Sequence, residues 1–369
     1  MRALLLCGLL LLSPADMGPA ATPPADAEEY LDAMDLTAWD DYFSRLEGVE
    51  PWQRPSVLAR EIAAGEADPG RLLAWLKAEG LGGLSHAAAL CLAALVTGVL
   101  GALLETILDG PSLPARRVLA SGLAALLLVR LLPLIREGLR CLRGILALSE
   151  VTVPLMTGVL LLLGSPQGSA AMGTLGELLL YTCLRWMEGS LAPLALSAGV
   201  LRAADLAGDS VLTAISRLLF ALARWGVRVI CLGYSLVAAL MGAGAAGMDS
   251  LLLRTGRAAA GSLPMVGSMV SDSLGAAVAC LGLVKGALGR TGLVLVTARI
   301  AAPVTALFLH GFGFKTASAL LAPLEQREMS TLLHALGEML VLLGALDLAA
   351  GAMLSVTVAG AAGCLGGGL

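Results

Sequence analysis

Long apolar stretches constrain this chain more than any other feature of its sequence. Crossing a hydrocarbon core of about 30 Å takes an α-helix of about 20 apolar residues. Seven regions have roughly that length and character: His86–Leu108, Val118–Ile135, Gly144–Gly164, Ala170–Leu201, Val227–Met248, Thr291–Leu309 and Leu332–Leu365. Charged residues make up only 14% of the chain, whereas soluble domains carry about 25%. We predict an all-α, polytopic helical membrane protein with about six to eight membrane segments, one of them broken or re-entrant.

The N-terminal part differs sharply from the rest. Residues 1–20 combine Arg2, an apolar core over 3–12 and small residues before a cleavage point after Ala20, which is typical of a signal peptide. Residues 21 to 80 hold thirteen Asp and Glu against five Lys and Arg, a net charge of −8. We therefore predict an acidic, helical, extracytoplasmic region over 21–83 and a polytopic membrane domain over 84–369. The acidic surface argues against nucleic acid as a partner.

Arginine clusters complicate the topology. One lies at 116–117 and another at 136–143, each between two apolar regions. Basic clusters favour the cytoplasmic side, so strict alternation puts one of them on the wrong side of the membrane. Either one apolar region is re-entrant or one cluster lies on a surface helix. Residues 202–228 have the pattern of such a helix, either an interfacial one beside anionic lipid or an ordinary juxtamembrane helix.

Charged residues also interrupt the apolar regions. A charge at the centre of a span costs about 2.5–3.5 kcal/mol on insertion scales, so it usually faces a partner or a water-filled space. Arg185 and Glu188 are spaced to pair along one helix, and Arg299 is expected to pair with Glu338 or Asp347 from another helix. Structural pairing and a polar pathway through the bundle remain as alternatives. The interrupting residues are Glu105, Arg130, Glu150, Glu177, Arg185, Glu188, Arg299, Glu338 and Asp347.

The segment 254–293 reads as neither a plain span nor a polar loop. Pro264 and Gly267 break the backbone pattern. Asp272 and Lys285 follow, either as a coupling pair or as the cap and the C-terminal cation of one helix. Glycines that permit close helix contact come next: Gly282, Gly286, Gly289 and Gly292. We predict a broken, glycine-rich central segment packed inside an assembly.

This segment resembles a known family. The pattern Pro-x-Val-Gly-x-x-x-Ser-Asp precedes a small-residue helix and Leu-Val-Lys-x-x-x-Gly-x-x-Gly, as in the central block of stage III sporulation protein AE of endospore-forming bacteria. The matching residues are Pro264, Val266, Gly267, Ser271, Asp272, Leu283, Val284, Lys285, Gly289 and Gly292. The resemblance covers roughly 254–330 and departs from the family at Gly286, where an Asn is expected.

The resemblance implies a role in sporulation. The family's protein sits in the mother-cell-derived outer forespore membrane with the other stage III A operon proteins, which include ring-forming subunits and a secretion-type ATPase. That complex meets stage II sporulation protein Q across the intermembrane space. The implied function is a membrane subunit of a transenvelope channel or secretion-like complex needed for late forespore development.

Two other functions stay open: a self-contained secondary transporter and a non-conducting membrane scaffold. A transporter of that kind would show two broken helices in corresponding halves, and only one broken segment is evident. Enzyme motifs such as Walker A, HExxH and GxSxG are absent from the sequence, and the three histidines and seven cysteines form no ligand cluster. We expect no enzymatic activity, cofactor or metal ion.

Overall fold

The computed structural model describes residues 36–44, 54–64, 69–107, 113–162, 176–205, 211–261, 267–324 and 327–362. Every element in these ranges is helical, which confirms the predicted all-α class. The α-helices are α3 (Thr37–Ser44), α4 (Pro55–Ala64), α5 (Pro69–Ile107), α6 (Leu113–Leu162), α8 (Glu177–Trp186), α9 (Ala192–Ala204), α10 (Val211–Gly261), α11 (Gly267–Leu321) and α12 (Arg327–Ala362). A π-helical turn, η4 (Met187–Leu191), joins α8 to α9, and a 3₁₀ turn, η5 (Ala322–Leu324), follows α11. The predicted signal peptide lies outside the described residues.

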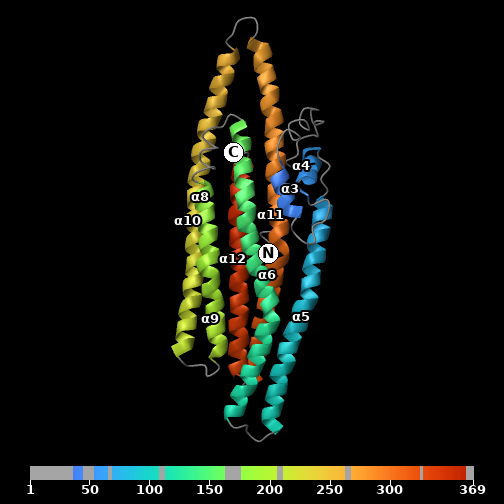
Figure 1. Cartoon of the computed structure of the whole chain (residues 1–369), viewed down its shortest axis with the longest axis vertical. Coiled ribbons are helices and arrows are strands. Elements are labelled where there is room, and N and C mark those ends of the chain that lie inside the picture. Colours follow the sequence, from blue (N-terminus) through green and yellow to red (C-terminus); the bar gives the residue numbers. More distant parts are fainter. Residues whose placement is uncertain are drawn as a thin grey trace.

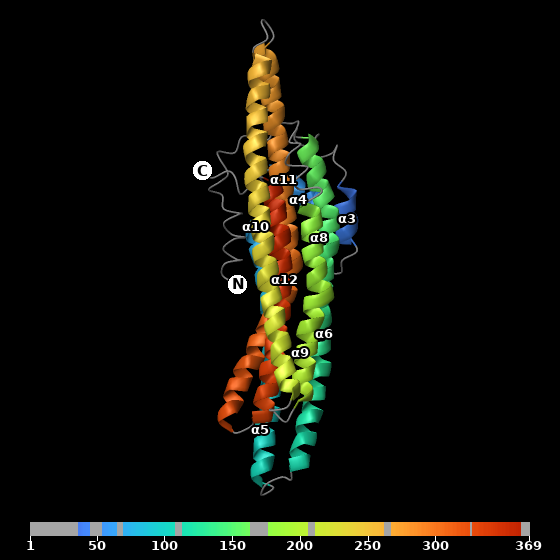
Figure 2. The ribbon, with the colours of Figure 1, turned by 90° about the vertical axis from the view of Figure 1, so that its left-hand side faces the viewer.

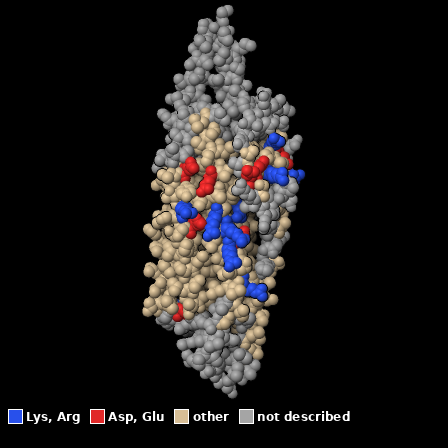
Figure 3. All heavy atoms as spheres, in the orientation of Figure 1, with Lys and Arg blue, Asp and Glu red and all other residues tan. Residues whose placement is uncertain are grey.

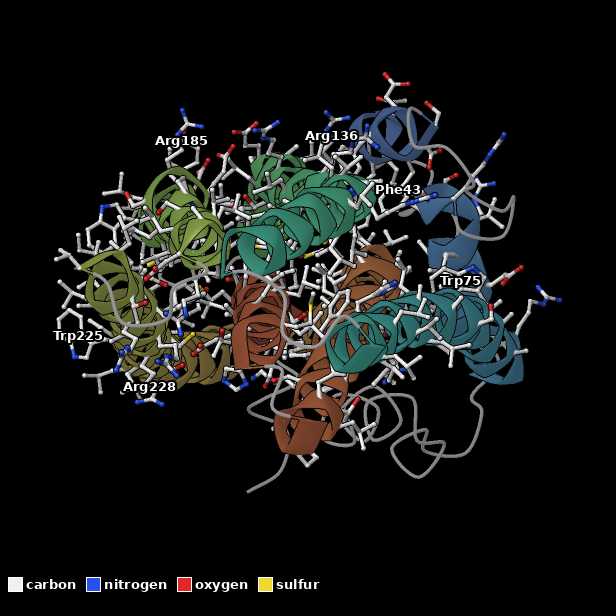
Figure 4. All side chains as sticks on the ribbon, turned by 90° about the horizontal axis from the view of Figure 1, so that it is seen from below. Phe43, Trp75, Arg136, Arg185, Trp225 and Arg228 are labelled. Atoms are coloured by element: carbon white, nitrogen blue, oxygen red, sulfur yellow. The ribbon has the colours of Figure 1, made fainter. Side chains whose placement is uncertain are left out.

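The long helices form an elongated antiparallel bundle (Figure 1). Successive runs alternate in direction: α5, α6, α8 with α9, α10, α11 and α12. Figure 2 shows the α10–α11 pair extending beyond the other helices at one end, with the α5–α6 pair extending at the other. Seen from below in Figure 4, α6 and α9 lie in one layer, with α10, α12, α11 and α5 in a second. Helix α12 is central, because it packs against α6, α9, α10 and α11.

The helices are longer than the apolar regions suggested. Helices α6, α10 and α11 have 50, 51 and 55 residues, or roughly 75–83 Å at 1.5 Å per residue. The predicted region Val118–Ile135 lies within α6, as does Gly144–Gly164 up to Leu162, so the expectation of two separate segments there was wrong. Arg140 and Arg143 sit between them on the outer face, with side chains 70% and 66% exposed. The prediction had placed the arginines at 136–143 in a loop between two membrane segments. Because they lie on an exposed face of one continuous helix, no loop is present there and the conflict between the two arginine clusters does not arise.

The predicted surface helix at residues 202–228 is also corrected. Helix α9 ends at Ala204, and residues from Val211 onward belong to α10, which continues without a break to Gly261. The first part of α10 has three distinct faces. Ser216, Phe220 and Ala223 are buried, while the arginines and the apolar side chains are exposed on two different sides. A helix lying on the surface would not have this buried face, which packs α10 against its neighbours.

Around the central segment, the structure shows two long helices. Helix α10 ends at Gly261 and α11 begins at Gly267, so Pro264 lies in the short stretch outside the described residues. Ser271 and Asp272 are inside α11 rather than at its N-terminal cap. Because α10 and α11 pack against each other, the backbone break joins the two arms of a helical hairpin.

Two helical stretches in the described part are long and apolar enough to cross a membrane: Ala287–Leu321 in α11 and Met329–Ala361 in α12. They are also the two that pack together most extensively. Elsewhere, large apolar side chains point outward along α10, including Leu218, Leu232 and Leu236. An exposed apolar stripe of this length marks a surface that contacts lipid or another protein.

Glycines bring α11 and α12 into backbone contact. A Cβ on Gly337 would lie 2.7 Å from the carbonyl oxygen of Gly311, and one on Gly311 would lie 3.1 Å from the carbonyl oxygen of Gly337. Gly344 and Gly351 continue this line along α12 at intervals of seven residues, against Leu307 and Ile300. Small residues at such a seam let helices approach closely where the lipid offers no hydrophobic drive for association.

The described acidic region packs on the bundle rather than standing apart from it. Trp39 and Phe43 of α3 and Leu58 and Ala59 of α4 are buried in the same core as the long helices. Helix α4 contacts α11, and α3 contacts α6. Helix α5 runs without a break through the predicted boundary at 83 and 84. The short helices therefore form a cap on one side of α6 and α11.

The glycine seam predicts a strong difference between two glycines of α12. Gly337→Ala should lower the free energy of unfolding by about 1–3 kcal/mol, because the added methyl group meets backbone that cannot rotate away. A Cβ at Gly360 would meet no atom within 4 Å. Gly360→Ala should therefore be neutral, or stabilising by up to about 1 kcal/mol because alanine has the higher helix propensity. Thermal unfolding of the purified variants in one detergent, followed by circular dichroism, measures both. Equal melting temperatures for the two variants would contradict the seam.

Candidate functional site

A partly buried charged cluster lies where α6, α11 and α12 meet. Arg299 of α11 extends over Gly144 of α6, and a Cβ at Gly144 would lie 2.9 Å from both Nε and one terminal nitrogen of the guanidinium. Arg299 Nη2 donates a hydrogen bond to the carbonyl oxygen of Arg140 at 3.3 Å. The missing side chain at Gly144 thus makes room for the guanidinium between the two helices.

Asp347 of α12 is the most unusual group in this cluster. Its side chain is fully buried, and neither carboxylate oxygen has a hydrogen-bond partner among the described residues. The carboxylate is near enough to be attracted by Arg299 and repelled by Glu137, yet it forms no ion pair with Arg299 within 4 Å. Nε of Arg299 is likewise buried without a partner in the described part of the chain. A buried, unpaired carboxylate is costly and, at membrane depth, is a functional-site hypothesis by default.

Helix α3 covers this cluster from outside. Tyr42 Oη donates a hydrogen bond to the carbonyl oxygen of Gly144 at 2.7 Å, and Trp39 Nε1 donates to Thr152 Oγ1 at 3.2 Å. Burial raises the pKa of Tyr42, and the positive charge of Arg299 opposes that increase. Because both aromatic residues bond to α6, the N-terminal helix closes the side of the bundle next to Arg299.

The surface near the cluster carries paired charges. Glu188 accepts from Arg143 at 3.0 Å and from Arg185 at 3.3 Å, so the predicted pairing of Arg185 with Glu188 is confirmed. Glu188 lies in the π-helical turn η4, a kind of local distortion that is frequent at functional sites. Figure 3 shows basic and acidic side chains gathered together at mid-height on one face of the molecule. Both arginines are well exposed, so the pairs contribute little to stability.

The prediction that Arg299 pairs with Glu338 or Asp347 holds only in part, because Arg299 interacts electrostatically with Asp347 without forming an ion pair. Glu338 pairs with Arg224 of α10 at 2.9 Å rather than with Arg299. Arg299 bonds to a backbone carbonyl, and Asp347 stays without a hydrogen-bond partner among the described residues. The structure thus brings Arg299 and Asp347 near each other and leaves Glu338 in a separate place on α12.

The predicted residues of the central segment are described only in part. Gly289 and Gly292 are buried in α11, and a Cβ on Gly292 would lie 3.0 Å from Val358 and 3.7 Å from Trp39. Helix α11 begins at Gly267 and contains Asp272, Lys285 and Gly286. Side-chain surroundings lie outside the described part for four residues: Gly267, Asp272, Lys285 and Gly286.

Sequence reasoning missed Gly144, Tyr42 and Trp39. The chain contains 45 glycines, so nothing marked Gly144 as the one beneath a guanidinium. Trp39 and Tyr42 lie three residues apart in an acidic helix, a spacing that places them on one face. That spacing was the available signal for a contact with the bundle. Within the described residues, no group of three or more His, Cys, Asp or Glu side chains is placed to hold a metal ion.

Comparison with known proteins identifies the family. The family model described as stage III sporulation protein AE matches residues 85–364, which include the whole charged cluster except α3. Neither a curated protein nor a solved structure gives a significant match. Since the match covers most of the chain and all of its long helices from residue 85 onward, the chain belongs to the stage III sporulation protein AE family.

Proposed function

We propose that this protein is a membrane subunit of the transenvelope channel or secretion-like complex that links mother cell and forespore. Family membership supports a role at stage III of sporulation. The two apolar stretches in α11 and α12 support a membrane location. In this proposal the protein resides in the outer forespore membrane with an extracytoplasmic N-terminus. It assembles with the ring-forming proteins and the ATPase of its operon and, through them, with stage II sporulation protein Q.

The observation that carries the proposal is the unpaired carboxylate of Asp347 beside Arg299. Both residues belong to the helical stretches that are apolar enough to span a membrane. A pure scaffold gains nothing from such a group, because replacing a buried charge with a neutral residue is often neutral or stabilising. A subunit that moves ions or protons, or that changes conformation during export, requires a polar group at this depth.

Loss of the gene should produce a developmental defect only. We expect a deletion strain to arrest after engulfment and form few heat-resistant spores, while vegetative growth rate stays at the parental value. Fluorescence microscopy of membrane-stained cells and counts of heat-resistant spores measure these two outcomes. Slow vegetative growth, or lost uptake of a defined solute, would instead indicate a secondary transporter.

Substitutions at Asp347 separate an active subunit from a scaffold. Asp347→Asn and Asp347→Leu should each reduce heat-resistant spores by on the order of tenfold or more, because each removes the ionisable carboxyl group at this depth. The protein should still accumulate in the membrane at the parental level. Glu150→Gln removes an exposed carboxylate of α6 and serves as the matched control, with normal sporulation expected.

A non-conducting scaffold predicts a different outcome for the same variants. If the protein is a scaffold, both Asp347 variants should sporulate normally and melt at the same or a higher temperature than the parental protein. Immunoblots of membrane fractions and melting curves of the purified variants distinguish this outcome from simple loss of folding.

A further inference from the structure

A second polar feature lies on a different side of α12. A cavity of about 430 Å³ opens between the end of α9, the first turns of α10 and the neighbouring ends of α11 and α12. Three arginines line it, Arg202 from α9 and Arg217 and Arg224 from α10, against a single lining carboxylate, Glu338. The imidazole of His334 in α12 also lines the cavity. Positive charge therefore dominates this cavity.

The three guanidinium groups differ in how they are neutralised. Arg202 lies 3.9 Å from the buried carboxylate of Asp205 and also contacts Thr213. Arg224 is paired with Glu338 at 2.9 Å. Arg217 has no ion pair or hydrogen bond to any residue that the structure describes. One guanidinium at the cavity thus keeps all of its donors for a ligand.

The walls of the cavity are fixed by hydroxyl groups. Ser318 Oγ donates to the carbonyl oxygen of Ser330 at 2.7 Å, and Ser330 Oγ donates to the carbonyl oxygen of Ser318 at 3.0 Å. Ser216 Oγ donates to the carbonyl oxygen of Ala198 at 2.9 Å, which ties α10 to α9. With these hydroxyls engaged between helices, the arginines are the main donors that face the cavity. Guanidinium groups suit phosphate because they form bidentate, charge-assisted hydrogen bonds.

The position of the cavity suits a ligand at a membrane boundary. Ser318 and Ser330 lie near adjoining ends of the two apolar stretches in α11 and α12, where lipid headgroups would meet the protein. The same turns of α10 carry exposed Leu218, Leu222 and Trp225. Figure 4 shows Trp225 and Arg228 pointing outward from α10, away from the side that bears Arg136 and Arg185. Basic pockets between membrane helices are a known mode of anionic headgroup recognition.

We propose that this cavity binds a phosphate group, with Arg217 as its principal ligand and Arg202 and Arg224 beside it. The phosphate belongs either to the headgroup of an anionic phospholipid or to a soluble phosphate compound. The proposal does not rest on the sporulation role above, because its three arginines belong to α9 and α10 and take no part in the Asp347 cluster. It can therefore be tested on the purified protein without any sporulating cell.

Binding is measured on the full-length protein in neutral detergent. Phosphatidylglycerol is titrated in mixed micelles with phosphatidylcholine in one arm, and inorganic phosphate in the other, with native mass spectrometry and melting temperature as readouts. We expect a bound phosphate species and a higher melting temperature for the parental protein. Arg217→Gln should raise the dissociation constant on the order of tenfold, as expected when hydrogen bonds to a charged group are lost. Arg228→Gln, on the same helix but outside the cavity lining, should bind as the parental protein does.

The two arms identify the source of the phosphate. Binding in the lipid arm alone assigns a headgroup, and binding in the inorganic arm assigns a soluble phosphate; either supports the site if it depends on Arg217. No binding in either arm, or equal binding by the Arg217→Gln and Arg228→Gln variants, overturns the proposal. Arg217→Lys keeps the charge and should retain part of the affinity. Because Arg217 is exposed, both of its variants should melt at the parental temperature without ligand.

Discussion

The contact between α11 and α12 is the interaction on which the rest of the bundle depends. Helices in lipid gain little from burying apolar surface against each other, so close packing and satisfied backbone have to hold them together. Gly311 and Gly337 allow the two backbones to touch, and Gly344 and Gly351 extend the contact along α12. Once α12 is fixed on α11, it offers its remaining faces to α6, α9 and α10. A wider seam at this place would move α12 away from α11 and so disturb its contacts with α6, α9 and α10.

The same close packing isolates the charges inside the bundle. Asp347 is held by its neighbours with no polar atom in hydrogen-bonding reach among the described residues, and Arg299 occupies the space that Gly144 leaves. Each charge alone destabilises a membrane interior. Helix α3 completes the enclosure through Trp39 and Tyr42, so part of the acidic region contributes directly to the environment of these charges.

Much of the fold was predictable from local pattern, and much of the site was not. Apolar length and composition indicated helices, and the spacing of Arg185 and Glu188 predicted their ion pair. The predicted helix boundaries were wrong where charges lie on an exposed face of a continuous helix, as at Arg140 and Arg143 of α6. Periodicity alone does not distinguish a charged helix face from a loop. The partner of Glu338 and the role of Gly144 depend on which helices are neighbours. That information is not contained in any single segment.

Helix α12 connects the two polar features of the molecule. Glu338, at the cavity, and Asp347, in the buried cluster, are nine residues apart, or about 14 Å along a helix. Glu338 is tied to Arg224 of α10, whereas Asp347 is near Arg299 of α11. A small shift of α12 along its axis would therefore change both environments together, since packed helices move as units.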